Sequence, residues 1–377
     1  MNDIFRIHAE DSVAVALHDL APGDTAEGNG FSAAVREKVP NGHKLALRRI
    51  EKGESVLKYG WPIGRAKETI EPGCWVHSHN MESQLEGLEH CRYEPQWNDL
   101  EQKPPVCFDG YRRTDGKTGV RNELWILPMV GCVNGLAKQL ERLASSRLPA
   151  GIDGVFAFQH SCGCSQLGDD LRHTQKLLKG LLLHPNAGGV LALCLGCENN
   201  RPEDMQALLG EYDRDRIQFL VCQECEDEIE EGLRILDRLG QYAASFHREP
   251  CPVSSLTVGL KCGGSDGLSG ITANPLVGSF SDWLLSRGGS CVLTEVPEMF
   301  GAERLLMNRC RSKPVFDAAL GLINGFREYF MRYGQPIDEN PSPGNREGGI
   351  TTLAEKSLGC VQKSGTAPVE DVLLYGE

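Results

Sequence analysis

Leu260-Lys-Cys-Gly-Gly-Ser-Asp-Gly-Leu-Ser-Gly-Ile-Thr-Ala-Asn-Pro-Leu-Val-Gly278 is the stretch around which the rest of the chain is interpreted. It follows an apolar run over residues 253–260 that alternates like a β-strand. Its glycines permit unusual backbone conformations and let a ligand approach the main chain closely. Between them stand a cation, a thiol, a carboxylate, hydroxyls and an amide, on Lys261, Cys262, Ser265, Asp266, Thr272 and Asn274. We interpret the stretch as a loop that binds a polar ligand; the alternative is a glycine-rich turn with ordinary caps.

Outward from this loop, apolar runs of strand length alternate with segments of helical periodicity. The expected strands cover residues 124–130, 154–158, 189–193, 217–221, 253–260 and 291–294. The expected helices cover residues 134–145, 166–183, 203–210, 225–240, 276–287 and 315–332. Such alternation is typical of a mainly parallel sheet with helices on both faces. The sequence therefore predicts an α/β fold for this part of the chain.

Reactive side chains follow every expected strand. In chain order they include Cys132, then His160 with Cys162 and Cys164, then Cys194 and Cys197, then Cys222 and Cys225, then Lys261 and Cys262, and finally Glu295. The carboxyl ends of parallel strands line the ligand crevice of an open α/β sheet. We therefore expect a site at that edge of the sheet.

The cysteines at these strand ends leave two kinds of chemistry open. Three or four thiolates could hold an iron–sulfur cluster. In the other interpretation, histidine and carboxylate groups hold a harder metal and the cysteines pack as small apolar residues. The pairs at 194/197 and 222/225 match no known cluster spacing, which makes the cluster the less favoured choice. Nucleophilic catalysis by Cys162 with His160 would need an orienting third residue, and the sequence names none.

Residues 1–82 are expected to form a small β-rich domain, because short alternating segments are separated by Pro-Gly, Asn-Gly and Lys-Gly turns. It closes with Gly73-Cys-Trp-Val-His-Ser-His-Asn80. On a strand, His77 and His79 would point to the same face, where two imidazoles can share a metal with a third ligand. The alternative is that both are polar surface residues at the end of a strand.

Residues 83–105 are expected to be a linker, and residues 106–377 the α/β catalytic domain, incomplete at its carboxyl end because residues 350–377 are polar and mixed. Near the start of this domain lie Arg112, Arg113 and Arg121 among glycines. Guanidinium groups suit carboxylates, so these arginines are candidates for an acidic substrate. A tight basic hairpin on the surface is the alternative.

The composition excludes some functions. The 377 residues carry a formal net charge of −13, which argues against a general binder of nucleic acid or anionic membranes. No apolar run approaches the length of a membrane span. Fifteen cysteines favour a reducing cytoplasm over a secreted disulfide framework.

Several long motifs resemble the altronate/galactarate dehydratase family of sugar-acid dehydratases. They are GYRRTDGKTGVRN at 110–122, HSCGC at 160–164, the loop at 260–278, TEVPEMFGAE at 294–303 and EKSLGCVQKSG at 355–365. The first eighty residues resemble the small β-clip (SAF-type) domain that opens these proteins, including its closing HxHN. NGHKLAL at 41–47 and KYGWPIG at 58–64 favour the altronate branch over the galactarate branch.

The resemblance implies loss of water from D-altronate to give 2-keto-3-deoxy-D-gluconate, in the breakdown of hexuronates such as galacturonate. It also implies a divalent metal, Fe²⁺ or Mn²⁺; a homo-oligomer fits as well. Galactarate or another aldonate or aldarate is the alternative substrate. Because family chains continue beyond residue 377, an inactive sugar-acid-binding remnant is the alternative from another class.

Loss of water next to a carboxylate requires several catalytic groups in the active site. The enediolate needs positive charge, a base must remove the C2 proton, and an acid must protonate the leaving hydroxyl. The candidates are Lys261 or His160 as base; Glu295 and Asp266 as acid/base groups or completing ligands; His77 and His79 as metal ligands; Arg112, Arg113 and Arg121 for the substrate carboxylate; and Ser265, Thr272 and Asn274 for the sugar hydroxyls.

Overall fold

The computed structural model describes residues 2–374. Its contacts divide the chain into two compact units. The first unit joins the chain up to Pro104 with Thr257–Val372, and the second unit is built on Pro105–Leu256. The boundaries expected from the sequence, at 82/83 and 105/106, stay predictions, but the contacts assign residues 106–256 and 257–372 to different units.

The first unit begins with a β-rich region. Strands β1 (Ile4–Phe5), β2 (Val13–Ala16), β5 (Lys44–Ala46) and β8 (Trp75–Val76) form an antiparallel sheet. Strands β6 (Ser55–Lys58), β7 (Trp61–Ala66) and β9 (Met81–Glu82) form a second one, and β3 (Thr25–Glu27) pairs with β4 (Ser32–Ala34). Short strands joined by glycine turns confirm the β-rich start of the chain.

The rest of the first unit is α/β. Strands β17 (Thr257–Leu260) and β18 (Ser290–Leu293) form a parallel pair. The helices are α5 (Ala273–Leu285), α6 (Glu303–Met307), α7 (Lys313–Arg332), α8 (Pro343–Glu347) and α9 (Leu353–Cys360), with 3₁₀ turns η4 (Val296–Met299) and η5 (Val361–Ser364). Every residue of α9 is buried, and the Thr352 hydroxyl caps its first turn by accepting from the Glu355 amide.

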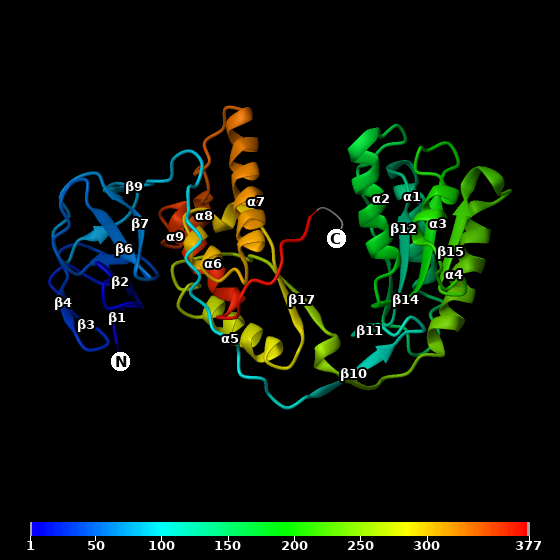
Figure 1. Cartoon of the computed structure of the whole chain (residues 1–377), viewed down its shortest axis with the longest axis horizontal. Coiled ribbons are helices and arrows are strands. Elements are labelled where there is room, and N and C mark those ends of the chain that lie inside the picture. Colours follow the sequence, from blue (N-terminus) through cyan, green and yellow to red (C-terminus); the bar gives the residue numbers. More distant parts are fainter. Residues whose placement is uncertain (1, 375–377) are drawn as a thin grey trace. The chain divides into compact units, whose positions relative to one another are not determined.

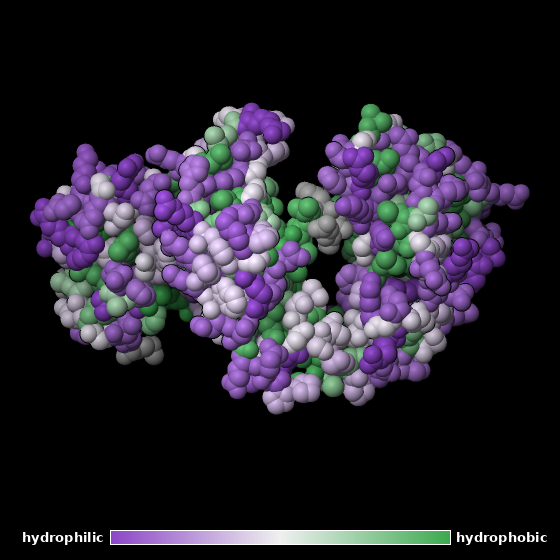
Figure 2. Space-filling model, viewed as in Figure 1, coloured by the Kyte–Doolittle hydropathy of each residue, from purple (hydrophilic) through white to green (hydrophobic). Residues whose placement is uncertain are grey.

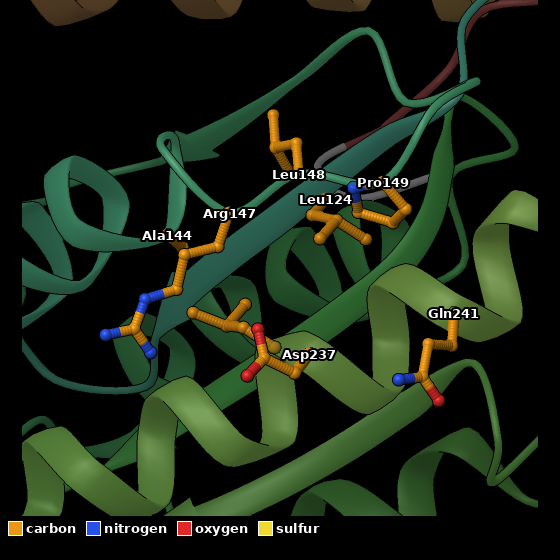
Figure 3. A pocket seen from close by; sticks show the side chains of 8 residues that line it. Leu124, Ala144, Arg147, Leu148, Pro149, Asp237 and Gln241 are labelled. Atoms are coloured by element: carbon orange, nitrogen blue, oxygen red, sulfur yellow. The ribbon is translucent and has the colours of Figure 1, made fainter.

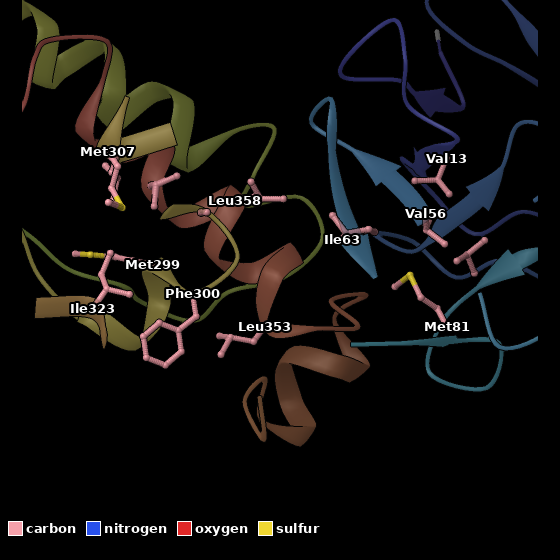
Figure 4. Close-up of a cluster of buried hydrophobic side chains, with 14 of the residues drawn as sticks. Val13, Val56, Ile63, Met81, Met299, Phe300, Met307, Ile323, Leu353 and Leu358 are labelled. Carbon is pink, nitrogen blue, oxygen red and sulfur yellow. The ribbon is translucent and has the colours of Figure 1, made fainter. Parts of the chain in front are cut away.

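One hydrophobic core runs through the first unit. Val13, Ile63 and Met81 of the β-rich region belong to the same buried cluster as Phe300 and Leu353 of the helical part (Figure 4). Burial of apolar surface is the main favourable term in folding. The two ends of the chain therefore fold into one unit by sharing a core.

The second unit contains a parallel sheet of four strands. Its order is β13 (Gly154–Ala157), β12 (Glu123–Pro128), β14 (Ala187–Cys194) and β15 (Ile217–Val221). Helices α1 (Asn134–Ala144) and α4 (Glu228–Ala244) cover one face, and α2 (Gly168–Leu182) and α3 (Pro202–Leu209) cover the other (Figure 1). Along β12, Leu124 and Ile126 pack on the first face, whereas Trp125 and Leu127 pack on the second. This alternation explains why the strand is apolar throughout.

A small antiparallel sheet completes the second unit. Strand β10 (Cys107–Arg112) pairs with β11 (Thr118–Gly119) and with β16 (Glu249–Pro252). Two further 3₁₀ turns, η1 (Gly131–Val133) and η2 (Cys222–Glu224), follow β12 and β15. In the view of Figure 2, hydrophilic residues cover most of the visible face of each unit. Among residues 2–374, no helix combines the length and apolarity needed to cross a bilayer.

The α/β fold with parallel sheets is confirmed, but two details of the prediction are wrong. Residues 253–260 are not one strand, because Val253–Ser255 form the 3₁₀ turn η3 and the strand begins at Thr257. The six strands also do not share one sheet, since β17 and β18 pair only with each other among the described residues. Hydrophobic periodicity identifies a strand but not its neighbours, and this is why the split was not foreseen.

Candidate functional site

A compact cluster of ligand-type side chains lies in the first unit. The thiol sulfurs of Cys262 and Cys360 and a carboxylate oxygen of Glu298 all lie within 4.8 Å of one another. Cys262 follows β17, Glu298 stands in η4 shortly after β18, and Cys360 ends the buried helix α9. The cluster therefore combines two strand ends with one helix end.

Glu298 is held by Lys356, which lies on α9. The Lys356 Nζ is 2.7 Å from Oε1 of Glu298, and their side chains are only 8% and 11% exposed. The other oxygen, Oε2, is buried and has no hydrogen-bond partner among the described residues. Burial alone would raise the pKa of Glu298, but the hydrogen bond and charge of Lys356 outweigh it and lower this pKa. Burial, followed by the negative charge of Glu298, raises the pKa of the Cys360 thiol.

Lys261 and Glu295 lie beside this cluster. The Lys261 Nζ is 3.6 Å from Oε1 of Glu295, and the lysine side chain is 76% exposed. The Cys262 amide donates to Oε2 of Glu295, and the Cys262 sulfur is 3.0 Å from the Ser265 hydroxyl oxygen. Glu295 has the left-handed backbone conformation with φ 66°, which costs free energy for a residue other than glycine. Two predicted catalytic residues are thus brought together next to Cys262.

The other polar residues of the loop support its shape. Oδ1 of Asp266 accepts from the amides of Leu268 and Ser269 and from the Ser269 hydroxyl, and the Thr272 hydroxyl donates to the Leu268 carbonyl. The Ser265 carbonyl accepts from the Asn345 side chain, and Asn274 is buried at the start of α5. These contacts show Asp266 as a turn-capping group; its catalytic role stays a prediction.

A buried ion network adjoins α9. One carboxylate, Glu355, lies 2.8 Å from the ammonium nitrogens of both Lys44 and Lys58, and all three side chains are nearly inaccessible. Burial alone would raise the pKa of Glu355, but the two ammonium groups lower it to about 2. Burial lowers the pKa of Lys44 to about 8, and repulsion by Lys58 adds to this effect, although Glu355 opposes it. These residues lie in the sequence motifs that carry the family resemblance, but their partnership has no local sequence signal.

His77 and His79 do not lie on a strand as predicted, because β8 ends at Val76 and both follow in a turn. The His77 Nε2 is 3.0 Å from the Arg346 carbonyl and so donates to it, while Nδ1 is 3.0 Å from the Ser78 hydroxyl. His79 is exposed, with its ring centroid 4.9 Å from that of Trp75. Among residues 2–374, neither histidine belongs to a group of three potential metal ligands.

The imidazole of His77 is expected to make stability fall on mild acidification. Burial, with the nearby Lys44 charge, lowers its pKa to about 4 from 6.5. Between pH 6.5 and 4 the unfolded chain therefore binds a proton that the folded chain does not. The stabilisation is complete above pH 6.5 and is lost as the pH falls toward 4, by about 1–3 kcal/mol. Urea unfolding at several pH values measures this, and His77→Gln should flatten the curve; an unchanged slope would contradict the assignment.

The predicted site residues of the second unit mostly make structural contacts. Arg112 is paired with Glu249, Nε to Oε1 at 2.6 Å, and Arg121 is exposed. Arg113 is only 3% exposed and donates to the Pro185 and Arg121 carbonyls and to Oδ1 of Asn122. Its guanidinium is thus not available to a substrate carboxylate in this structure.

His160 has both ring nitrogens engaged. Nε2 is 2.8 Å from the Pro128 carbonyl oxygen, and because a carbonyl can only accept, Nε2 is the donor. Nδ1 accepts from the Cys162 amide at 3.1 Å. This arrangement fixes a neutral tautomer with no free lone pair. Within residues 2–374 the cysteines after β12 to β15 gather no group of three ligand atoms.

The second unit has a pocket of about 340 Å³ at the amino end of β12, away from the carboxyl ends of its strands (Figure 3). It is lined by Leu124 near the start of β12 and by residues of α1, the following loop and α4, which are Ala144, Arg147, Leu148, Pro149, Leu236, Asp237 and Gln241. The lining offers one cation and one carboxylate on a largely apolar surface. It has no nucleophile or cluster of metal ligands.

Comparisons with known proteins cover nearly the whole chain. Residues 2–84 match the altronate/galactarate dehydratase SAF domain, residues 110–244 the second domain of D-galactarate dehydratase/altronate hydrolase, and residues 253–377 the D-galactarate/altronate dehydratase C-terminal domain. Altronate dehydratase of Escherichia coli is 51% identical over 99% of this chain and 76% of its own length. Altronate dehydratase of Bacillus subtilis is 48% identical over 100% of this chain and 76% of its own.

A third relative, galactarate dehydratase (L-threo-forming) of Escherichia coli, is 32% identical over 99% of this chain and 74% of its own length. The protein is accordingly an enzyme, a carbon–oxygen lyase of the hydro-lyase type. It belongs to the altronate/galactarate dehydratase family, and it is more similar to the two altronate dehydratases than to this galactarate dehydratase.

Proposed function

We propose that the protein removes water from D-altronate to give 2-keto-3-deoxy-D-gluconate, as a step in hexuronate breakdown. The observation that carries the proposal is the identity of 51% and 48% to altronate dehydratases over 99% and 100% of the chain. All 15 cysteines are free, which suits a reducing cytoplasm, where we place the reaction.

The residues around Cys262 suit this chemistry. An exposed ammonium, Lys261, stands 3.6 Å from the Glu295 carboxylate, so a cation and a proton acceptor are paired beside the cluster. We assign Glu295 as the base that removes the C2 proton, and Lys261 as the cation that holds the substrate carboxylate. The sequence offered Lys261 or His160 as the base. We assign the role to Glu295 instead, because a lysine acts as a base only as the neutral amine and Lys261 is paired with a carboxylate.

A divalent metal fits the donor set of Cys262, Glu298 and Cys360, since the buried Oε2 of Glu298 is without a partner among the described residues. When bound, such a metal supplies positive charge to stabilise the enediolate. The residues of the chain do the rest: Lys356 orients Glu298 through Oε1, and the Cys262 amide orients Glu295. We propose a metal-dependent reaction on this basis.

A panel of aldonates and aldarates, assayed for 2-keto acid with the metal varied, tests the function. We expect 2-keto-3-deoxygluconate from D-altronate and little product from galactarate. Preferential turnover of galactarate would move the protein to the other branch of the family. Binding of a sugar acid without any 2-keto acid, at every metal tested, would contradict the enzymatic assignment.

Replacing Glu295 by glutamine is expected to lower kcat for altronate by roughly 10²–10⁴-fold, the usual contribution of a positioned acid or base. Lys261→Met should instead raise KM, because it removes the cation assigned to the substrate carboxylate. Steady-state kinetics of both variants distinguish the two roles. The reverse pattern, with KM raised by Glu295→Gln and kcat lowered by Lys261→Met, would overturn the assignment.

A further inference from the structure

We propose that Cys262, Glu298 and Cys360 form a three-ligand metal centre that selects a thiophilic divalent ion, of the type of Fe²⁺, Co²⁺ or Zn²⁺, over Mg²⁺, Ca²⁺ and Mn²⁺. The inference deepens the proposed function, because it names the ligands and narrows the metal. It rests on the geometry of these three side chains, and a metal-binding measurement can test it without an activity assay.

The spacing of the three ligand atoms is close to that of a bound site. They lie within 4.8 Å of one another. Metal–sulfur and metal–oxygen bonds of about 2.3 and 2.1 Å in a tetrahedron place ligand atoms roughly 3.4–3.8 Å apart. Cys262 is only partly buried and stands in the loop after β17, so a shift of its side chain would close this difference. Binding would release the two thiol protons to solvent.

The buried carboxylate of Glu298 has room for a further partner. Oε2 of Glu298 is inaccessible and has no hydrogen-bond partner among residues 2–374. A buried polar atom left in this way costs roughly 1–3 kcal/mol. The groups that face the Glu298 carboxylate, besides Lys356, are the thiols of Cys262 and Cys360. A cation bound between this oxygen and the two sulfurs would satisfy it.

The support around the cluster resembles that of functional metal sites. Lys356 and Cys360 are four residues apart on α9, so both point to one side of the helix, toward Glu298. The contact of Lys356 Nζ with Oε1, at 2.7 Å, leaves Oε2 as the oxygen free to bind a metal. Outer groups that orient ligands in this way are a regular part of metal sites.

The ligand types decide the metal. Thiolates favour zinc and iron, whereas magnesium, calcium and manganese prefer sites built from oxygen. Two thiolates and one carboxylate therefore favour Fe²⁺ over Mn²⁺ as the activating ion. Three protein ligands also leave a fourth position open for substrate or water, as in catalytic sites.

The test uses the whole protein, reduced, metal-free and under anaerobic conditions, titrated with Co²⁺ as the probe. We expect one equivalent to bind, with sulfur-to-cobalt charge-transfer absorption, and excess Mn²⁺ not to displace it. Glu298→Gln and Cys262→Ser should each weaken binding by about 100-fold or more, and Lys356→Met by about 10–100-fold. Thermal unfolding without metal shows whether each variant is folded; Cys262, in a loop, is the variant least able to disturb the core.

Matched controls are Cys310→Ala, which removes another buried thiol of the first unit, and His77→Gln with His79→Gln, which tests the other candidate ligands. All should bind Co²⁺ like the wild type. Absorption that persists in both Cys262→Ser and Cys360→Ser, or that is lost only in the histidine variants, would overturn the proposal. So would a Cys262–Cys360 disulfide in the isolated protein whose reduced form binds no metal.

The binding test separates this inference from the proposed function. Co²⁺ binding through the three residues without dehydration of any sugar acid would keep the centre and reject the function. Metal-dependent dehydration of altronate with Co²⁺ binding unchanged in Glu298→Gln would keep the function and reject the centre.

Discussion

Replacing Glu355 by glutamine is expected to lower the free energy of unfolding of the first unit by about 3–5 kcal/mol, the usual cost of breaking a buried ion pair. The variant keeps the shape of the side chain but leaves the ammonium groups of Lys44 and Lys58 buried without a countercharge. Lys44 retains bonds to the Gly349 carbonyl and the Thr351 hydroxyl, which neutralise no charge. Urea unfolding of wild type and variant at neutral pH measures the difference.

A suitable control is Glu51→Gln, since Glu51 forms an exposed pair with Arg49 at 2.7 Å and should not change stability measurably. Removing one of the two cations as well, in Lys58→Met/Glu355→Gln, should recover part of the loss. If Glu355→Gln unfolds at the same urea concentration as the wild type, the network does not stabilise the fold in the way its burial implies.

Gly267→Ala is the second substitution with a large expected effect, a destabilisation of about 3 kcal/mol or more, at the upper end for overpacking. A Cβ atom at this position would lie 1.8 Å from the carbonyl oxygen of Gly42. The obstacle is backbone, and it cannot rotate away. The Gly267 amide also donates to the Gly348 carbonyl at 2.6 Å, so the loop has little freedom to move. Thermal or urea unfolding gives the measurement.

The same loop contains its own controls. A Cβ atom on Gly263 or on Gly264 would meet nothing within 4 Å, and neither residue has positive φ. Gly263→Ala and Gly264→Ala should therefore unfold like the wild type. Equal stability of all three variants would show that Gly42 and Gly267 are not in close contact in solution.

These glycines refine the interpretation of the loop at 260–278. The sequence suggested that its glycines let a ligand approach the backbone. The structure gives Gly267 and Gly270 a packing reason instead, since a Cβ on Gly270 would meet the Tyr59 hydroxyl at 2.0 Å. Only Gly263 and Gly264, next to Cys262, face open space. The ligand-binding interpretation therefore narrows to the first part of the loop.

Local structure was predictable from the sequence where the hydrophobic pattern is strong. The strand expected over residues 217–221 matches β15 at both ends, and the helix expected over 134–145 differs from α1 by one residue. The helix α1 buries one regular face, and the strand β15 is a short apolar run. The spacing of hydrophobic residues in the sequence reflects such burial directly.

The candidate site was predictable only in part. Lys261 and Glu295 follow neighbouring parallel strands. Both were predicted as site residues because such residues gather at the carboxyl ends of parallel strands. Cys360, Lys356 and Glu298 were not singled out, because a helix end and a 3₁₀ turn carry no such rule. His77 and His79 were misplaced because their alternation is that of a strand, whereas the chain turns at this point.

The ion network also sets an order for biosynthesis. Glu355 follows Lys44 by 311 residues and Lys58 by 297, and the strands that carry these lysines leave the ribosome first. At a synthesis rate of about 5–20 residues per second, Glu355 is added roughly 15–60 s after the two lysines. The second unit, contiguous over residues 105–256, can fold in that interval. The amino-terminal strands therefore cannot complete their buried ion network until α9 has been synthesised.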